Sequence, residues 1–348
     1  MILFIGPFPP PVHGASAVTQ RAFESLRAAN LELSPVDVSP NGRGIQYHIS
    51  RFSRFWLCWS RLFTIKDDTV VYVSLSGGGG LIYDVVTAAV IYLRRFRVVY
   101  HHHSYAYISQ RSPLVALILT LSLKAQTHVF LSEGMKCDFT ERYGSCNGVV
   151  VSNLAFFPAK LADARVGSLR VIGYLSNITF EKGLDRFLDL MAQLKASGSE
   201  LTARIAGPVG DDQVRAALER SVSEIGNIEY VGPVYDEKKD EYYDSIDFFI
   251  FPTRYVNEAQ PMTVYEAQLA GLPVAVSDRG CLADMCGPND ILLDPNSSNL
   301  SVLVNTLIMY ENDREAFDRV KAACVARQRA LLEEAARSKQ TFLQCFFG

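Results

Sequence analysis

The chain has 348 residues, of which 49% are hydrophobic and 20% charged, and its 34 Lys and Arg against 37 Asp and Glu give a net charge of −3. This much apolar material excludes a disordered chain, and the near-neutral charge argues against a dedicated nucleic-acid binder, which carries a basic excess. At about 100–200 residues per domain, the length predicts two domains.

The seven scattered cysteines, with no Cys-x-x-Cys pair, favour a reduced intracellular protein over a disulfide scaffold. The N-terminus lacks a basic signal-peptide region. The longest apolar stretches, 81–93 and 114–123, are shorter than the roughly 20 residues that span a bilayer. We therefore expect a cytoplasmic protein, and peripheral attachment to the inner face of the plasma membrane stays open.

Short apolar runs alternate with amphipathic segments from end to end. The alternation predicts βαβ units, and therefore parallel sheets covered by helices. The predicted strands are Ile2–Ile5, Thr69–Leu75, Arg97–His101, His128–Leu131, Val149–Val151, Arg170–Tyr174, Thr202–Ala206, Ile228–Val231, Phe248–Phe251 and Val274–Ser277. The amphipathic segments predicted as helices include Ala15–Ala29, Leu184–Lys195, Asp211–Ser223 and Tyr265–Ala270.

The alternation breaks over Phe156–Ser168, where we predict a linker. This places one doubly wound domain at 1–160 and a second at 169–326. The remaining residues, 327–348, read as one helix ending in aromatic residues, and we expect it to dock back toward the N-terminal domain. Because ligands of such sheets bind beyond the carboxyl ends of the strands, we expect the site in a cleft between the two domains.

The most informative motif surrounds two glutamates. A predicted strand ends near Pro252, the loop after it carries Glu258, and Glu266 lies one turn into the helix that follows. Free amides at a helix start bind anions. Two surface carboxylates beside a helix start are the plain alternative. The residues predicted to form the anion site are Pro261, Met262 and Thr263.

Glu258 and Glu266 have the E-x7-E spacing of retaining glycosyltransferases of family GT4, which have the GT-B fold, and the Glu-Ala-x-x-Ala-Gly-x-Pro-Val pattern is similar as well. The resemblance implies that the first glutamate meets the donor sugar and the second holds the nucleotide ribose. The sequence departs from the family at Ala259 and Pro261, where many members have Gly.

A second stretch, Gly173–Leu184, resembles the strand and loop that open the C-terminal domain in this family. The resemblance implies that Lys182 reaches the donor diphosphate, where its charge stabilises the leaving phosphate. Asn177 stands where the family often has Arg, so it donates a hydrogen bond without supplying charge. The Gly-Pro turns at Gly207 and Gly232 resemble family loops near the nucleotide, although ordinary turns use the same residues.

The loop after the first strand is similar to the family's first loop, where donor phosphate and acceptor meet. Here Gly14 and Ala15 would present free amides at a helix start. The loop lacks the Gly-x-Gly-x-x-Gly fingerprint, which weakens a dinucleotide oxidoreductase reading. The four glycines at 77–80 are interpreted either as an acceptor loop or as a flexible connector.

Three histidines end the strand that begins at Arg97. Alternate residues of a strand share a face, so His101 and His103 point one way and His102 the other. The resemblance points to one histidine that contacts the donor sugar, and His103 fits best. A metal site is the alternative, but no carboxylate or Cys stands at a suitable spacing, and we predict none.

Both tryptophans lie in 51–63, where five aromatic residues recur on one helical face. Such a helix can lie in an anionic membrane interface, and packing on the N-terminal core is an equal alternative. The aromatic residues are Phe52, Phe55, Trp56, Trp59 and Phe63, and the arginines around them are Arg51, Arg54 and Arg61.

Together the patterns indicate an α/β protein of the GT-B fold, with two Rossmann-like doubly wound domains facing a central cleft. The resemblance implies metal-independent, retaining transfer of a sugar from a UDP- or GDP-linked donor to a saccharide or lipid-linked saccharide in cell-surface polysaccharide synthesis. It implies no further cofactor and no nucleic-acid partner. The alternatives are a GT-B sugar-nucleotide epimerase and a non-catalytic, sugar-nucleotide-binding subunit that recruits a partner to membrane. The expected catalytic residues are Glu258, Lys182 and His103, and the expected nucleotide contacts are Glu266, Gly14, Ala15, Asn177, Gly207, Gly232, Pro261, Met262 and Thr263.

Overall fold

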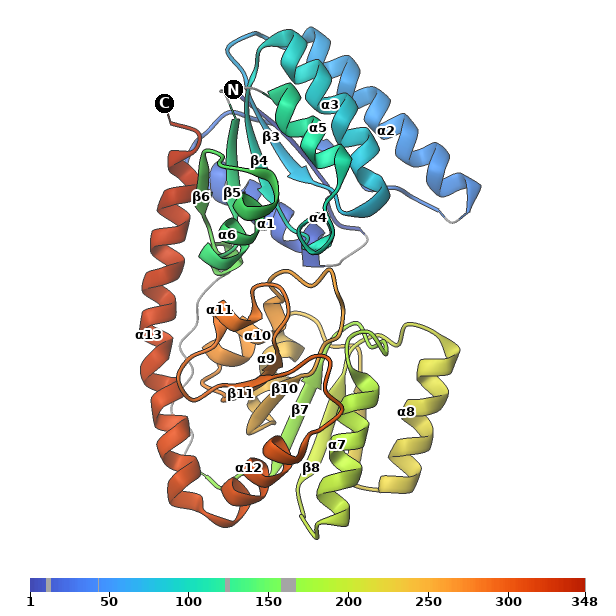
Figure 1. The fold of residues 1–348 in the computed structure, drawn as a ribbon, viewed down its shortest axis with the longest axis vertical. Coiled ribbons are helices and arrows are strands. Elements are labelled where there is room, and N and C mark those ends of the chain that lie inside the picture. The colour runs from blue at the N-terminus through green and yellow to red at the C-terminus, as the bar shows by residue number, and fades with distance from the viewer. Residues whose placement is uncertain (11–13, 43, 123–125, 158–166, 348) are drawn as a thin grey trace. The chain divides into compact units, whose positions relative to one another are not determined.

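The computed structural model describes the chain except residues 11–13, 43, 123–125, 158–166 and 348. The chain forms two compact units: unit 1 comprises Met1–Phe157 and Glu334–Gly348, and unit 2 comprises Pro158–Glu333. Each unit is built on a six-stranded parallel sheet flanked by helices (Figure 1). The predicted α/β fold with two doubly wound domains is confirmed. Most of the linker predicted at Phe156–Ser168 lies outside the described residues.

The sheet of unit 1 has the strand order β2-β1-β3-β4-β5-β6, with every pair parallel. The chain passes from β1 outward to β2 and then returns to the other side of β1, so the strand order reverses between β1 and β3. The strands are β1 (Ile2–Gly6), β2 (Leu33–Asp37), β3 (Val70–Leu75), β4 (Arg97–His102), β5 (Gln126–Phe130) and β6 (Gly148–Val150). The helices are α1 (Gly14–Ala28), α2 (Ile45–Thr64), α3 (Leu81–Arg94), α4 (Ala106–Ser109), α5 (Pro113–Ser122) and α6 (Glu133–Tyr143).

The sheet of unit 2 has the order β12-β11-β10-β7-β8-β9, again parallel throughout. Here the order reverses between β7 and β10. The strands are β7 (Val171–Leu175), β8 (Thr202–Ala206), β9 (Ile228–Gly232), β10 (Phe248–Phe251), β11 (Val274–Ser277) and β12 (Ile291–Leu293). The helices are α7 (Leu184–Ala196), α8 (Asp212–Ile225), α9 (Glu237–Asp244), α10 (Met262–Leu269), α11 (Leu282–Met285) and α12 (Ser301–Asn312). Helix α13 (Arg314–Gln344) begins in unit 2 and ends in unit 1.

Four elements differ from the sequence predictions. The edge strands β2 and β12 were not predicted, because β2 contains polar residues and a proline, and β12 is only three residues long. Helix α13 begins at Arg314 rather than at residue 327. Helix α10 begins at Met262, and Pro261 caps it with extended backbone (φ −70°, ψ 128°) instead of forming its first turn.

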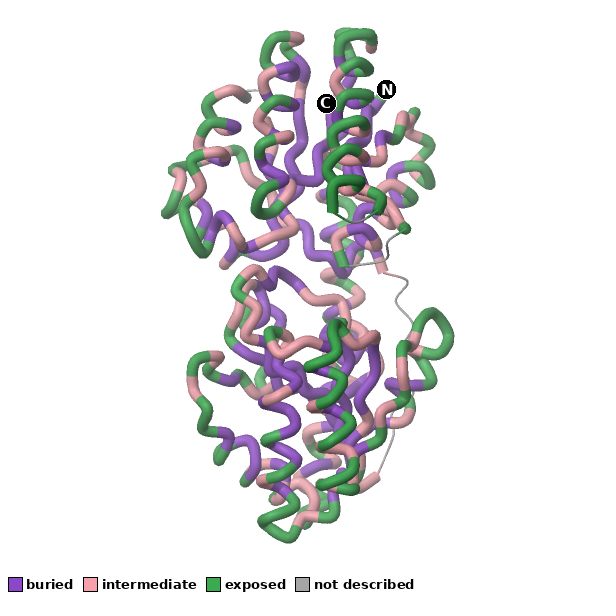
Figure 2. The backbone as a smooth tube through the Cα atoms, turned by 90° about the vertical axis from the view of Figure 1, so that its right-hand side faces the viewer, coloured by how far each residue is buried: buried purple, intermediate pink, exposed green. Residues whose placement is uncertain are grey.

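The cores lie between the sheets and their helices, and Figure 2 shows long buried stretches through each unit. In unit 1 the ring of Tyr72 stacks on Phe4 at 4.0 Å, and Phe342 and Phe346 from the end of α13 pack against it. In unit 2, α7 contributes Phe187 to the core cluster. No helix within the described part of the chain is long and apolar enough to cross a membrane.

Candidate active site

The loops that follow β7 and β10 carry an ion pair at the point where the strand order of unit 2 reverses. Lys182 Nζ lies 2.6 Å from Glu258 Oε2, although the two residues are 76 positions apart in the sequence. In doubly wound sheets, ligands bind at the carboxyl ends of the two strands that flank this reversal. The topology therefore brings together two of the predicted catalytic residues at the position where such folds bind ligands.

Close backbone contacts fix the loop of each partner. Gly183 caps α7 in the left-handed region (φ +89°), and a Cβ there would lie 2.2 Å from Pro252 O. Gly280 (φ +56°) approaches the backbone of Glu258, where a Cβ would lie 2.1 Å from its carbonyl oxygen. Only glycine allows both approaches, because any side chain would force the loops apart.

A second ion pair joins the first turn of α7 to the loop after β10. Arg254 Nη2 lies 2.5 Å from Asp185 Oδ2, and the Arg254 amide donates to Glu181 O at 2.8 Å. Both groups of this pair are about 40% exposed, and such pairs contribute little to stability. Their role is to connect the start of α7 to the loop after β10, which keeps Lys182 close to Glu258.

The Glu258 carboxylate is nearly enclosed, with 9% of its side chain exposed. Besides Lys182, it accepts a hydrogen bond from Thr253 Oγ1 at 3.3 Å. The Lys182 ammonium lies 4.7 Å from the centre of the Tyr255 ring, a cation–π distance. A lysine held by one carboxylate and one ring is positioned before any ligand arrives.

Glu266 has a lysine partner of its own that the sequence analysis did not identify. Lys239 Nζ from α9 lies 2.6 Å from both Glu266 oxygens, and Tyr243 Oη donates to Oε2 at 2.9 Å. Burial and the nearby Glu266 charge raise the pKa of Tyr243 well above 10, so its hydroxyl stays protonated. A sequence signal existed, because Lys239 and Tyr243 stand four residues apart and share a face of α9.

The other predicted nucleotide contacts of unit 2 lie in the loops that follow its strands. The amides of Met262 and Thr263 begin α10, and the first amides of a helix have no acceptor within it. Gly207 (φ +124°) comes so close to the β7 loop that a Cβ would lie 1.8 Å from Ser176 O, and its amide donates to Gly232 O. Asn177 is exposed in the loop after β7.

Comparison with known proteins agrees with this geometry. Residues 162–323 match the family model described as glycosyl transferases group 1. The matched range lies within unit 2 and includes Lys182, Glu258 and Glu266. A 2-deoxystreptamine glucosyltransferase from Streptomyces kanamyceticus is 31% identical over 120 residues, which are 34% of this chain and 30% of that protein.

Solved structures extend the likeness to both units. HepE from Anabaena, solved in complex with UDP, has a TM-score of 0.67 at 18% identity, covering 98% of each chain. Sucrose-phosphate synthase from Thermosynechococcus elongatus has a TM-score of 0.69 at 16% identity, covering 99% of this chain and 98% of its own. WaaG, a glycosyltransferase involved in lipopolysaccharide biosynthesis, matches over 100% of each chain with a TM-score of 0.63 and 13% identity. The predicted GT-B fold is confirmed.

In unit 1 the histidines lie at the carboxyl end of β4 and divide between two faces as predicted. His101 and His103 are neighbours, with ring centres 3.9 Å apart, and His102 lies on the other face, 2.9 Å from His128. The Nε2 atoms of His101 and His103 are both buried, and neither has a hydrogen-bond partner. Burial lowers the pKa of His103 to about 4, so its ring is neutral at pH 7.

The second histidine face is a chain of neutral rings. His128 Nε2 lies 3.0 Å from Gln126 Oε1, which can only accept, so His128 carries its proton there. His102 Nε2 then donates to His128 Nδ1, and the Tyr107 hydroxyl donates to His102 Nδ1 at 2.9 Å. Among the described residues, no group of three or more His, Cys, Asp or Glu side chains is arranged to hold a metal ion.

The first loop places its two predicted contacts at the start of a helix. α1 begins at Gly14, which is exposed, and Ala15 follows it. The glycines at 77–80 precede α3, and Gly77 lies against Ser104, where a Cβ would come within 2.8 Å of Oγ. This contact places the glycine loop beside the residue that follows His103.

The five aromatic residues of 51–63 share one side of α2, but they divide by environment. Phe55 and Trp59 pack on Tyr83 of α3, with ring centres 4.6 and 6.4 Å from it. Phe52, Trp56 and Phe63 are exposed and continue an exposed series from Ile45 and Ile49. We call Ile45, Ile49, Phe52, Trp56 and Phe63 the apolar stripe; each is between 51% and 75% exposed.

The arginines of this helix contact residues of their own unit, and Arg61 stays exposed while it does so. Arg54 Nη1 lies 2.5 Å from Asp37 Oδ2 at the end of β2, and Arg61 donates to Pro35 O at 3.1 Å. Arg51 lies over the Tyr83 ring at 5.3 Å. They attach α2 to its own unit, so the outward chemistry of α2 is mainly apolar.

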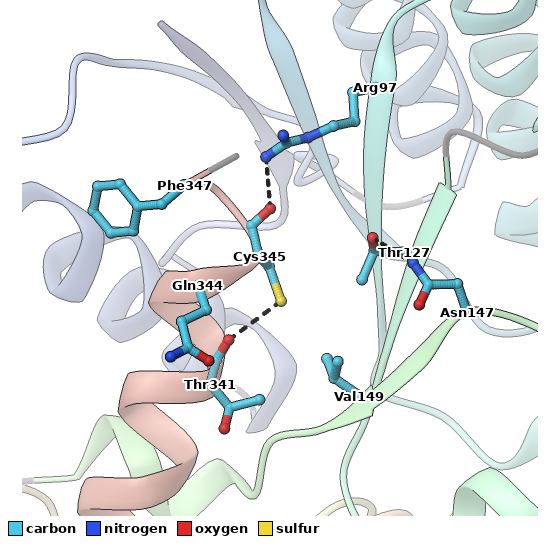
Figure 3. A pocket seen from close by; sticks show the side chains of 8 residues that line it. All are labelled: Arg97, Thr127, Asn147, Val149, Thr341, Gln344, Cys345 and Phe347. Carbon is cyan, nitrogen blue, oxygen red and sulfur yellow. Dashed lines mark hydrogen bonds between the residues drawn. The ribbon is translucent and has the colours of Figure 1, made fainter.

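A separate cavity of about 290 Å³ lies in unit 1, between the end of α13 and the sheet (Figure 3). Its lining includes Arg97, Thr127 and Asn147 at the amino ends of β4, β5 and β6. In Figure 3 Arg97 points toward the end of α13, where its Nη2 donates to Cys345 O at 2.9 Å. The cavity therefore lies at the sheet edge opposite to the one where doubly wound sheets bind ligands.

Proposed function

We propose that this protein is a retaining glycosyltransferase that moves a sugar from a UDP- or GDP-linked donor to a saccharide or lipid-linked saccharide acceptor in cell-surface polysaccharide synthesis. The observation that carries the proposal is the Lys182–Glu258 ion pair at the strand reversal of unit 2, within the residues that match the group 1 glycosyltransferase family. Similar proteins support it, since HepE was solved with UDP-glucose and WaaG takes part in lipopolysaccharide biosynthesis.

In the proposed reaction, Lys182 stabilises the diphosphate as it leaves. The bond between the anomeric carbon and the phosphate oxygen breaks, and the negative charge on that oxygen grows. An ammonium fixed before the reaction stabilises this charge without reorganising, and the amides of Met262 and Thr263 add partial positive charge. These groups supply the positive charge that a divalent metal supplies elsewhere, so we propose that no metal is required.

The acceptor hydroxyl forms its new bond to the anomeric carbon on the face that the nucleotide leaves, and its proton passes to the departing diphosphate. Glu258 and His103 orient the sugar during this step. The neutral ring of His103, with an unpartnered Nε2, suits a hydrogen bond to an uncharged sugar hydroxyl.

The decisive experiment incubates the purified chain with a panel of UDP- and GDP-sugars, with and without saccharide acceptors. Released nucleotide together with a glycosylated product in the α configuration from an α-linked donor supports the proposal. A new sugar isomer without an acceptor would mean an epimerase, and binding without turnover would mean a non-catalytic subunit. An inverted product would contradict the retaining mechanism alone.

We further propose that the apolar stripe of α2 attaches the enzyme to the membrane surface that holds a lipid-linked acceptor. The stripe keeps five large apolar side chains in water along one line, and exposed patches of this kind mark interaction sites. It contains Trp56, a residue type favoured at the boundary between lipid and water. Because the arginines are engaged with β2, attachment depends on the inserted side chains more than on anionic lipid.

A matched pair of variants tests the attachment. Trp56→Glu places a charge in the stripe, and Leu57→Glu makes the same change at an equally exposed position a quarter-turn or more away. Only Trp56→Glu should reduce co-sedimentation with vesicles, by about tenfold, because a charged side chain within the apolar stripe opposes its insertion between the lipid headgroups. Equal binding of both variants would contradict the proposal, and equal melting temperatures confirm that neither change unfolds the chain.

A further inference from the structure

We propose that Lys239 is a specificity residue of the donor site. Together with Glu266, it hydrogen-bonds the two ribose hydroxyls of the nucleotide. The inference rests on the proposed function, since it assumes that Glu266 meets the ribose. It starts from the structure, in which Glu266 is not a free carboxylate but is already held by Lys239 Nζ at 2.6 Å on each oxygen.

The hydrogen bonds already made limit what Glu266 can still accept. A carboxylate has about four lone-pair positions on its two oxygens. Lys239 occupies one on each oxygen, and Tyr243 occupies a second one on Oε2. The remaining position lies on Oε1. Glu266 can therefore accept one ribose hydroxyl but not two, unless Lys239 or Tyr243 is displaced.

Tyr243 is a poor candidate for displacement. It is 3% exposed, and its hydroxyl also lies 3.0 Å from Thr263 O. Its one proton is shared between Thr263 O and Glu266 Oε2, and moving the ring away from both acceptors would leave its buried hydroxyl without a partner, which costs free energy. Lys239 differs, because 28% of its side chain is exposed and its ammonium has three N–H groups. One N–H beyond the two that face Glu266 is free to donate to a ligand.

The two hydroxyls of a ribose are adjacent, and each can donate or accept. One hydroxyl donates to Glu266 Oε1, and the oxygen of the other accepts from Lys239 Nζ. The ion pair thus matches a diol with one acceptor and one donor. The lysine also neutralises a carboxylate that would otherwise repel the diphosphate of the same nucleotide.

The neighbouring Lys238 supplies a matched control. It lies on the same helix, carries the same charge and is exposed, whereas Lys239 is half-buried against Glu266. The experiment measures calorimetric affinities of wild type, Lys239→Met, Lys239→Arg, Lys238→Met and Glu266→Gln. The ligands are UDP, 2′-deoxy-UDP and 3′-deoxy-UDP, with GDP and its two deoxy forms in parallel.

The wild type should prefer the ribonucleotide over each deoxy form by about tenfold, the value of one hydrogen bond to a charged group. Lys239→Met should weaken binding of the ribonucleotide by about tenfold and reduce one of the two preferences to within about twofold. Lys239→Arg should restore that preference in part, and Lys238→Met should leave all affinities unchanged. A merely structural lysine would alter melting temperature without altering either preference.

Two results would overturn the inference, and they are distinguishable. If Lys239→Met keeps both preferences while Glu266→Gln loses them, Glu266 alone reads the ribose and the proposed function stands. If the wild type binds neither UDP nor GDP, the proposed function fails and the inference fails with it. Should Lys239→Met not fold, Lys239→Gln, which keeps a shorter uncharged donor, is judged by the same preferences.

Discussion

The carboxyl edges of the two sheets differ in whether their ionisable side chains are charged. In unit 2, each predicted glutamate has a lysine within 2.6 Å, and both pairs keep part of the lysine exposed. In unit 1, the corresponding region holds four histidines whose pKa values are all lowered by burial, so that the rings are neutral at pH 7.

The difference shows what kind of ligand group each edge can accommodate. Compensated charges that reach solvent can be shared with an incoming anion, because the lysines have N–H groups to spare. Neutral, desolvated rings suit uncharged hydroxyls and would oppose a phosphate only weakly. The lysines of unit 2 therefore fit the nucleotide diphosphate of the proposed reaction, and His103, which is less buried than the other three rings, fits a sugar hydroxyl.

The largest expected effect comes from removing one of the charged lysines of unit 2. Lys182→Gln should lower turnover by about 100- to 1,000-fold, since it removes a fixed positive group from the leaving phosphate. The measurement is steady-state turnover of the sugar nucleotide. Lys136→Gln, which removes a half-buried lysine 3.7 Å from Glu133 on α6, is the control and should have no effect. A fall in turnover of less than about threefold would remove Lys182 from the catalytic residues.

The two glutamates should separate binding from chemistry. Glu266→Ala should weaken nucleotide binding by about 10- to 100-fold, because the proposed function makes Glu266 the charged partner of the ribose. Glu258→Gln should lower turnover more than it lowers nucleotide affinity, because Glu258 orients the sugar in the proposed reaction. Calorimetry with the nucleotide and initial rates with the sugar nucleotide provide the two numbers. Unchanged nucleotide binding in Glu266→Ala would show that the ribose lies elsewhere.

The neutral side of the comparison predicts a loss of stability in acid. The unfolded chain exposes histidines with a pKa of about 6.5, whereas burial lowers that of His128 to about 4 in the folded chain. Below about pH 6.5 the unfolded state therefore binds more protons, and stability falls as the pH falls toward 4. His128 alone should cost about 2 kcal/mol between about pH 7.5 and about pH 5.

Asp84 opposes this trend, because burial raises its pKa to about 6 and its protonation stabilises the folded chain below that value. A comparison with His128→Asn cancels the contribution of Asp84. The Asn oxygen can replace Nδ1 as the acceptor for His102, but it does not titrate. Urea unfolding at both pH values should show a smaller acid loss in the variant. An equal loss would mean that His128 is not a neutral buried ring.

The smallest expected effect concerns metal removal, which should leave turnover unchanged. If Lys182 and the start of α10 supply the positive charge opposite the diphosphate, turnover should survive an excess of EDTA. Initial rates before and after chelation provide the measurement, with added manganese and magnesium as the second arm. Loss of turnover that either metal restores would contradict the metal-independent reaction and reopen the histidines as ligands.

The sequence by itself determined the parallel α/β architecture and the position of the main charged residues. Central strands such as β10, with all four residues buried, appear as continuous apolar runs because helices cover both faces. The sequence also located Glu258, Glu266 and Lys182, because each lies in a short motif whose residues are close together in the chain. The edge strand β2 was not predicted because it reads Leu-Ser-Pro-Val-Asp and has one buried residue. A proline and polar residues are tolerated where a strand has one neighbour.

Only the tertiary structure decided which charges meet. Lys182 reaches Glu258 because β7 and β10 are neighbours in the sheet, and no local pattern encodes that strand order. Lys239 reaches Glu266 because α9 packs beside α10, although the charged sequence of α9 reads as an ordinary solvated helix. Likewise, the direction of Arg54 toward Asp37 depends on where β2 pairs. Periodicity fixes which face of an element is apolar, but the partner of a polar group depends on elements that are distant in the chain.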